Sequence, residues 1–121
     1  MKLRDIASQI RAEVLSGEEL LDDIDIECAD GADLMSDVLA FARPGSLLLT
    51  GLTNIQIVRT AQMLDLPAVV FVRGKKPQEA AVKLASQIKM PILLCHMSMF
   101  ESCGILFQKG ILPCHIPDRG V

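Results

Sequence analysis

The fold is decided by residues 46–72, which read SLLLTGLTNIQIVRTAQMLDLPAVVFV. Residues 46–50 and 68–72 are short apolar runs, a pattern typical of strands that are buried on both faces. Between them, apolar residues recur at the spacing of one helical face: Ile57, Val58, Ala61 and Leu64. Because short loops join these elements, the stretch predicts two parallel strands connected by a crossover helix.

Capping signals indicate where the helices begin. Thr53 and Gln56 have the spacing of a capping box, in which each side chain bonds a free backbone N–H at a helix start. Ser98 and Glu101 repeat that spacing, and Pro77 suits the first position of a helix between them. We therefore predict helices that begin near these three places in the sequence.

Strand and helix continue to alternate toward the C-terminus. Residues 92–95 are apolar and predict another buried strand, and residues 111–112 predict a last short one. The helix before residue 92 carries a buried stripe made of Ala81, Leu84, Ala85 and Ile88. Phe100, Cys103 and Phe107 share one face of the following helix, and we assign that face to the core.

The first third of the chain has shorter patterns. Residues 3–10 have helical spacing, and residues 13–15 predict a short strand. Apolar and acidic residues alternate over 24–28, which predicts a half-buried strand followed by a turn at Asp30-Gly31. A second helical stripe, made of Met35, Val38, Leu39 and Ala42, ends before Pro44.

Together these patterns predict an α/β fold with a mostly parallel sheet and helices on both faces. We expect a single domain over residues 1–121, with a polar C-terminal tail over residues 113–121. The chain has 121 residues, a common size for one domain.

Composition argues against several partners. The net charge is −3 and the only aromatic residues are four phenylalanines, so neither an attractive field nor stacking platforms favour nucleic acid. The longest apolar run, residues 66–72, is too short to span a membrane. The N-terminus has no apolar signal core, so we expect a cytoplasmic protein with reduced cysteines.

Ligands of open α/β sheets bind at the carboxyl ends of the strands. The loops expected at that edge supply our candidate ligand-binding residues: Thr50, Gly51, Thr53, Asn54, Arg73, Lys75, His96 and Ser98. A helix N-terminus beside basic side chains favours an anion. The competing interpretation is ordinary turn and capping chemistry beside a solvated basic loop.

Asp30, Asp33 and Asp37 cluster around one expected helix start, and paired carboxylates can bind a cation or act as acid and base. Asp33 and Asp37 are four residues apart, so we expect them to share a helical face. Acids in a first turn also complement the helix dipole, which is the structural explanation for the cluster. We retain Ser36 and Asp37 as candidate interface or ligand contacts.

Catalytic and metal signatures are not recognised. Gly74-Lys75-Lys76 does not meet the P-loop pattern, and no cofactor motif occurs. We assign Cys28 and Cys103 to the core and predict no metal site, because the cysteine spacing fits no compact zinc module. Whether Cys95, His96, Cys114 and His115 have any role stays open at this stage.

Several segments match a known family in order and spacing. Residues 33–45, DLMSDVLAFARPG, followed by residues 64–77, LDLPAVVFVRGKKP, resemble stand-alone DRTGG-domain proteins, and Phe100-Glu101 with Gly104 and Gly110-Ile111 resembles the last family block. The resemblance implies a fold related to the N-terminal domain of HPr kinase/phosphorylase and a tendency to form homodimers. It also implies an accessory domain without catalysis of its own.

From these observations we expect a non-catalytic regulatory module that binds a ligand or dimerises, with a nucleotide or another anionic metabolite as the ligand. The alternative is a protein-interaction module that docks to a larger enzyme or kinase and binds no small molecule.

Overall fold

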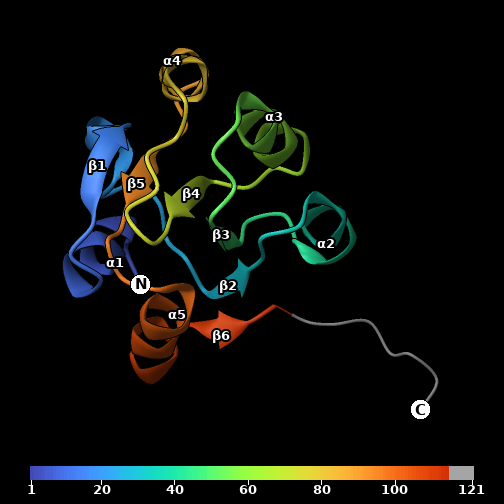
Figure 1. The fold of residues 1–121 in the computed structure, drawn as a ribbon. Coiled ribbons are helices and arrows are strands. Elements are labelled where there is room, and N and C mark those ends of the chain that lie inside the picture. Colours follow the sequence, from blue (N-terminus) through green and yellow to red (C-terminus); the bar gives the residue numbers. More distant parts are fainter. Residues whose placement is uncertain (115–121) are drawn as a thin grey trace.

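A computed structural model describes residues 1–114 of the chain (Figure 1). Its elements, in chain order, are α1 (Leu3–Gln9), β1 (Glu13–Ser16), a 3-10 turn (Glu18–Leu20), β2 (Cys28–Gly31), α2 (Met35–Phe41), β3 (Leu47–Thr50), α3 (Ile55–Met63), β4 (Ala68–Phe71), α4 (Glu79–Gln87), β5 (Ile92–Leu94), α5 (Met99–Gln108) and β6 (Leu112–Pro113). Most of the predicted tail, residues 115–121, lies outside the described residues.

The strands form one sheet in the order β1-β5-β4-β3-β2-β6. All neighbouring strands are parallel except β1, which pairs antiparallel with β5 at one edge. The sequence-based expectation of a mostly parallel sheet is therefore confirmed.

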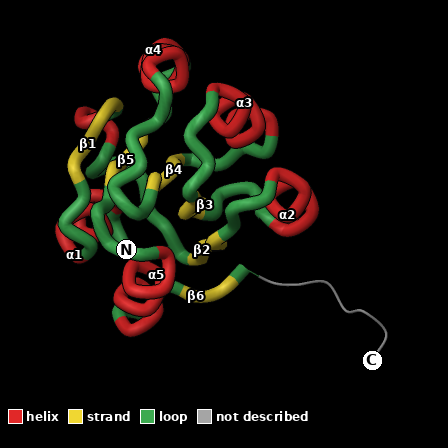
Figure 2. Tube along the Cα trace, in the orientation of Figure 1, coloured by secondary structure: helices red, strands yellow, loops and turns green. Residues whose placement is uncertain are grey.

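Helices cover both faces of this sheet (Figures 1 and 2). One core cluster joins the sheet to α2, α3 and α4, and the other joins it to α1 and α5. The chain moves across the sheet from β2 to β5 and then returns through α5 to β6 at the opposite side. A right-handed crossover that runs in the reverse direction must use the reverse face, which explains the position of α5.

The central strands explain the apolar runs in the sequence. Every residue of β3, β4 and β5 is buried, including Thr50. Side chains alternate between the two core clusters: Leu47 and Leu49 join the cluster of α1 and α5, and Leu48 joins that of α2–α4. Two covered faces require apolar residues at successive positions.

The predicted strand over residues 24–28 is wrong in its position. β2 begins only at Cys28, and the predicted turn at Asp30-Gly31 forms its last two residues. Asp25 instead makes an isolated bridge to Lys2, with 2.9 Å between Lys2 Nζ and Asp25 Oδ2. Asp25 therefore pairs with the start of α1, whereas the Glu27 carbonyl accepts from Leu112 N at 2.9 Å, and neither residue belongs to β2.

The predicted core face of α5 is also wrong. Phe100 is 90% exposed and Phe107 is 67% exposed, whereas Ser102 and Leu106 are buried. The Ser102 hydroxyl donates to the Ser98 and Met99 carbonyls at 2.9 and 3.1 Å. A serine satisfied within its own helix can face the core, so the aromatic residues lie outside it.

One predicted helix start is confirmed, and two are corrected. Ser98 Oγ accepts from Glu101 N at 3.0 Å, as predicted. Thr53 is not the cap of α3, because Asn54 Oδ1 accepts from Ile57 N at 3.2 Å. Pro77 likewise precedes α4, which begins at Glu79.

Replacing Asn54 with alanine is expected to lower the free energy of unfolding by about 1 kcal/mol, because the Ile57 N–H loses its acceptor. Thr53→Ala is the matched control and should change it by less than about 0.5 kcal/mol. Urea denaturation followed by circular dichroism measures both. A larger loss for Thr53→Ala would restore the capping box inferred from the sequence.

Candidate functional site

Four strand-to-helix connections meet at the carboxyl edge of the parallel strands. β4 leads to α4 on one face of the sheet, and β5 leads to α5 on the other. Neighbouring strands whose connections diverge in this way mark the usual ligand crevice of an open sheet. Two backbone bonds link the two connections here: Arg73 N to Met97 O at 2.8 Å, and Gly74 N to Cys95 O at 2.9 Å.

The main feature of this edge is a set of donors that converge on the Asp33 carboxylate. Asp33 Oδ1 accepts from Gly51 N at 2.7 Å, and Oδ2 accepts from Arg73 Nη2 at 2.9 Å. We use the term carboxylate cradle for Gly51 and Arg73 together with Asp33, whose carboxylate these two residues hold. Two of its three members, Gly51 and Arg73, were candidate residues from the sequence. The structure brings them together around a carboxylate of the same chain.

The role of Asp33 was missed in the sequence. We expected Asp33 and Asp37 to share a helical face, but α2 begins at Met35 and Asp33 lies in the loop before it. Partial burial acts to raise the pKa of Asp33, yet hydrogen bonds from Gly51 and Arg73, together with the charges of Arg73 and Lys75, lower it overall. The donors therefore stabilise a negative charge at this point.

Three other candidates have structural roles in the same loop. Thr50 is buried and its Oγ accepts from Leu52 N at 3.0 Å. Thr53 O accepts from Gln78 N at 2.8 Å, and Asn54 caps α3. These contacts fix the path of the chain around Gly51, which is the turn chemistry that the competing interpretation described.

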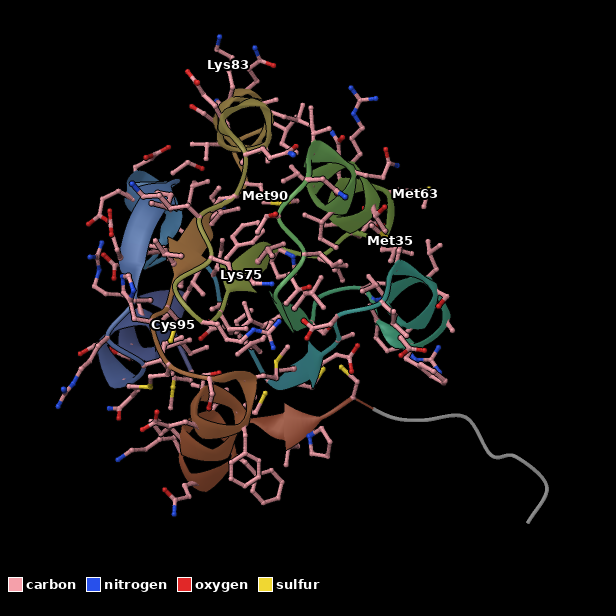
Figure 3. The ribbon with its side chains drawn as sticks, viewed as in Figure 1. Met35, Met63, Lys75, Lys83, Met90 and Cys95 are labelled. Carbon is pink, nitrogen blue, oxygen red and sulfur yellow. The ribbon has the colours of Figure 1, made fainter. Side chains whose placement is uncertain are left out.

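The remaining rim candidates are exposed. Lys75 projects from the β4–α4 connection over the strand ends, away from Lys83 on the outer side of α4 (Figure 3). His96 lies against Gly74, where an added Cβ would come within 2.8 Å of His96 Nδ1. Ser98 caps α5, so its side chain is engaged at that helix start.

Ser36 and Asp37 are exposed on α2 and do not join the carboxylate cradle. Asp37 instead lines a cavity of about 340 Å³ beside the end of β2, together with Asp30 and Phe41. We call this the α2 cavity. A second cavity of about 340 Å³, the α5 cavity, lies on the other side of the same strand end.

Asp30 lines both cavities. Its Oδ2 is buried and has no hydrogen-bond partner among residues 1–114. Burial and then the charge of Asp37 raise the pKa of Asp30, against a weaker opposing effect from the Gly31 N–H. The sequence analysis placed Asp30 in the acidic cluster, but the turn expected at Asp30-Gly31 did not predict a partly buried carboxylate at a strand end.

The four cysteines form no disulfide, and they are poorly placed for nucleophilic catalysis. Burial raises the pKa of Cys95, whose Sγ lies 3.3 Å from Ile10 O, while neighbouring His96 is exposed. Burial and a contact with Cys114 raise the pKa of Cys28 to about 11, at 3.6 Å between the sulfurs. Within residues 1–114 no group of three potential ligands is placed to hold a metal, and His115 lies outside that range.

Comparison of the sequence with family models and with curated proteins gives no match. Comparison of the fold gives a match to the CBS and DRTGG domains of the regulatory region of Clostridium perfringens pyrophosphatase, solved with its activator diadenosine tetraphosphate. The TM-score is 0.69 at 15% sequence identity, and the match covers 99% of this chain and 52% of that one.

This likeness shows a DRTGG-like α/β fold, and the chain spans about half of the regulatory region that it matches. That region is regulatory and binds a nucleotide activator. Separately, no helix described here is both long and apolar enough to cross a membrane.

Proposed function

We propose that this chain is a non-catalytic regulatory module that binds a nucleotide or another anionic metabolite at the carboxyl edge of its sheet. As part of this proposal, the chain is a DRTGG-type domain related to the N-terminal domain of HPr kinase/phosphorylase. The proposal also includes the candidate residues of the sheet edge, of which Gly51, Arg73 and Lys75 would contact the anion.

The carboxylate cradle carries this proposal. A backbone N–H and a guanidinium already hold a carboxylate at 2.7 and 2.9 Å. Phosphate oxygens offer the same acceptors to a guanidinium as carboxylate oxygens do. A ligand phosphate that displaces Asp33 would therefore meet donors that are already oriented, with the Lys75 charge close by.

The structural neighbour supports a regulatory role of this kind. Its regulatory region binds diadenosine tetraphosphate, an anionic nucleotide, as an activator. In the present chain, Asp33 would act as an internal competitor that a ligand must replace. Such competition lowers the affinity for weakly binding anions. Ligands with several phosphates would therefore be selected.

Replacing Asp33 with alanine is expected to tighten the binding of tripolyphosphate and of ATP by about tenfold, equivalent to about 1.4 kcal/mol. The reason is that the Gly51 N–H and the Arg73 guanidinium lose their internal acceptor. Isothermal titration calorimetry at fixed ionic strength measures the dissociation constants, because salt screens such contacts.

Two further variants make that experiment specific. Arg73→Gln in the Asp33→Ala background should weaken binding again, whereas Lys83→Gln, on the outer side of α4, should leave it unchanged (Figure 3). If neither anion binds to the native chain or to Asp33→Ala, the ligand-binding proposal is wrong. Turnover of ATP would contradict the non-catalytic part.

We also propose a homodimer. Leu34, Leu39 and Met63, at or near α2 and α3, are 61%, 49% and 65% exposed. Exposed large apolar side chains are common where a partner covers the surface. Sedimentation velocity at micromolar concentration should give twice the chain mass, and a monomer would contradict this part of the proposal.

The second candidate is a protein-interaction module that docks to a larger enzyme or kinase. The same exposed apolar side chains support it, as does the match of this fold to half of a larger regulatory region. A monomer that binds neither tripolyphosphate nor ATP would favour this candidate over the first.

A further inference from the structure

The side chains of Cys28 and Cys114 meet although 86 positions separate them in the sequence. Their sulfur atoms lie 3.6 Å apart, and both side chains are half-buried. Neither thiol belongs to the carboxylate cradle or to the proposed anion site. The pair is therefore a candidate for chemistry that the anion site does not use.

Strand pairing explains why the two thiols meet. β6 runs parallel to β2 at the edge of the sheet, with Cys28 opposite Leu112 and Ala29 opposite Pro113 (Figure 1). Cys114 comes two residues after Leu112, and side chains two residues apart along a strand share a face. Ala29 packs against the cluster of α1 and α5, so Cys28 points toward the other face, where Cys114 lines the α2 cavity.

The edge that these thiols could join is held by few contacts. β6 shares two residue pairs with β2, whereas the other neighbouring strands within residues 1–114 share three or four. Both residues of β6 are exposed, and Leu112 N donates to Glu27 O at 2.9 Å. A covalent bond between Cys28 and Cys114 would reinforce the shortest pairing of the sheet.

The remaining two cysteines lie on the opposite face of the sheet. Cys95 is buried in the core cluster of α1 and α5, and Cys103 packs against that cluster. Cys114 is half-buried and lines the α2 cavity, so a small reagent can approach it from there. Cys28 is absent from that lining, which makes Cys114 the thiol that a reagent meets first.

We propose that Cys28 and Cys114 are a reversible redox pair, which a low-molecular-weight disulfide such as oxidised glutathione converts into a disulfide that holds β6 against β2. In the first step, the Cys114 thiolate attacks one glutathione sulfur, the S–S bond of oxidised glutathione breaks, and one glutathione leaves as a thiol. In the second step, Cys28 Sγ attacks Cys114 Sγ and the second glutathione leaves. The two cysteines lose two electrons and two protons, and oxidised glutathione gains both.

The contact between the sulfurs makes the second step feasible. Burial, followed by the contact with Cys114, raises the pKa of Cys28 to about 11, so little of this thiol is ionised near neutral pH. An attack within the folded chain tolerates this, because the two sulfurs are held at a high effective concentration. Bond formation brings them from 3.6 Å to about 2.05 Å. Cys114 follows the last paired residue of β6, so this exposed end can move while the core strands stay in place.

Peptide mapping of the full chain tests the proposed bond. The chain is incubated with oxidised glutathione, its remaining thiols are blocked with iodoacetamide, and it is digested with trypsin. Cleavage after lysine and arginine places Cys28 in one peptide, Cys114 in a second, and Cys95 with Cys103 in a third. We expect the four free thiols to fall to two, with one product that joins the first two peptides. Dithiothreitol should restore all four thiols.

Serine variants show whether the link is specific. Cys28→Ser should stop at the mixed disulfide of Cys114 with glutathione, because the second attacking sulfur is missing. Cys95→Ser and Cys103→Ser are the matched controls and should still form the link. No cradle residue takes part, so this result is independent of whether the chain binds an anion.

Hydrogen exchange tests whether the bond holds β6 in place. In the oxidised chain, exchange of the Leu112 amide should slow by about tenfold or more, while the Val82 amide of α4 should be unaffected. Unchanged exchange at Leu112 would contradict a hold on β6. Absence of the Cys28–Cys114 peptide, equal amounts of links to Cys95 or Cys103, or a link between two chains on non-reducing electrophoresis would overturn the proposal.

Discussion

Replacing Phe71 with alanine is expected to lower the free energy of unfolding by about 3–5 kcal/mol. Phe71 is the last residue of β4 and is fully buried in the cluster between the sheet and α2–α4. Removing the ring leaves a void that close-packed neighbours fill only in part. Such a loss would be a large fraction of the stability of a small domain.

Phe100→Ala is the matched control, because it makes the same chemical change at a ring that is 90% exposed. It should alter the free energy of unfolding by less than about 0.5 kcal/mol. The chain has neither tryptophan nor tyrosine, so unfolding in urea is best followed by far-ultraviolet circular dichroism. Similar losses for both variants would mean that Phe100 is covered in solution by a partner.

The Phe71 result also bears on the site. Phe71 pairs with Thr50 in the sheet, and the residues after these two strands include Gly51 and Arg73. A β4 end that relaxes into a void would separate the two donors of the carboxylate cradle. Loss of anion binding by folded Phe71→Ala protein is therefore expected, whereas Phe100→Ala should bind normally.

The sheet could be predicted from sequence because burial on both faces leaves a simple signal. Residues 47–50, 68–71 and 92–94 are continuous apolar runs or nearly so, and each is a wholly buried strand. Short connections then require crossover helices. The helices between these strands could also be placed, although α3 and α4 begin one or two residues later than expected.

The buried face of a helix was harder to predict where apolar side chains are exposed and polar ones are buried. Phe100 and Phe107 have the spacing of a core stripe, yet Ser102 and Leu106 occupy the buried face of α5. Periodicity identifies which residues share a face but not which face meets the sheet when apolar residues surround the helix. The same limitation applies to Leu39, which is 49% exposed although Val38 is buried.

The site could be predicted only in part, because its central contact is long-range. Gly51 and Arg73 follow adjacent strands, so their loops could be expected to meet. Asp33 is 40 residues from Arg73 in sequence, and no local pattern shows that its carboxylate reaches both groups. The burial of the Asp30 carboxylate oxygen is likewise a property of the assembled fold.

Replacing Gly17 with alanine is expected to lower the free energy of unfolding by about 2–5 kcal/mol, the sum of two separate costs. Gly17 has φ of +81°, a conformation that costs an L-residue about 1–2 kcal/mol. In addition, a Cβ on Gly17 would lie 2.5 Å from the Cα of Pro91, just before β5. Backbone cannot move away as a flexible side chain can, so the antiparallel edge between β1 and β5 must shift.

Gly45→Ala separates these two costs. Gly45 has φ of +82°, but a Cβ there would meet nothing within 4 Å, so only the conformational cost of about 1–2 kcal/mol should appear. The difference between the two variants in urea unfolding thus measures the close approach of Gly17 to Pro91. Hydrogen exchange should be faster at Val14, opposite Leu93 in the pairing, for Gly17→Ala alone. Equal losses of unfolding free energy for the two variants would show that β1 adjusts freely to the added Cβ. The position of the β5–α5 loop would then not depend on the antiparallel edge of the sheet.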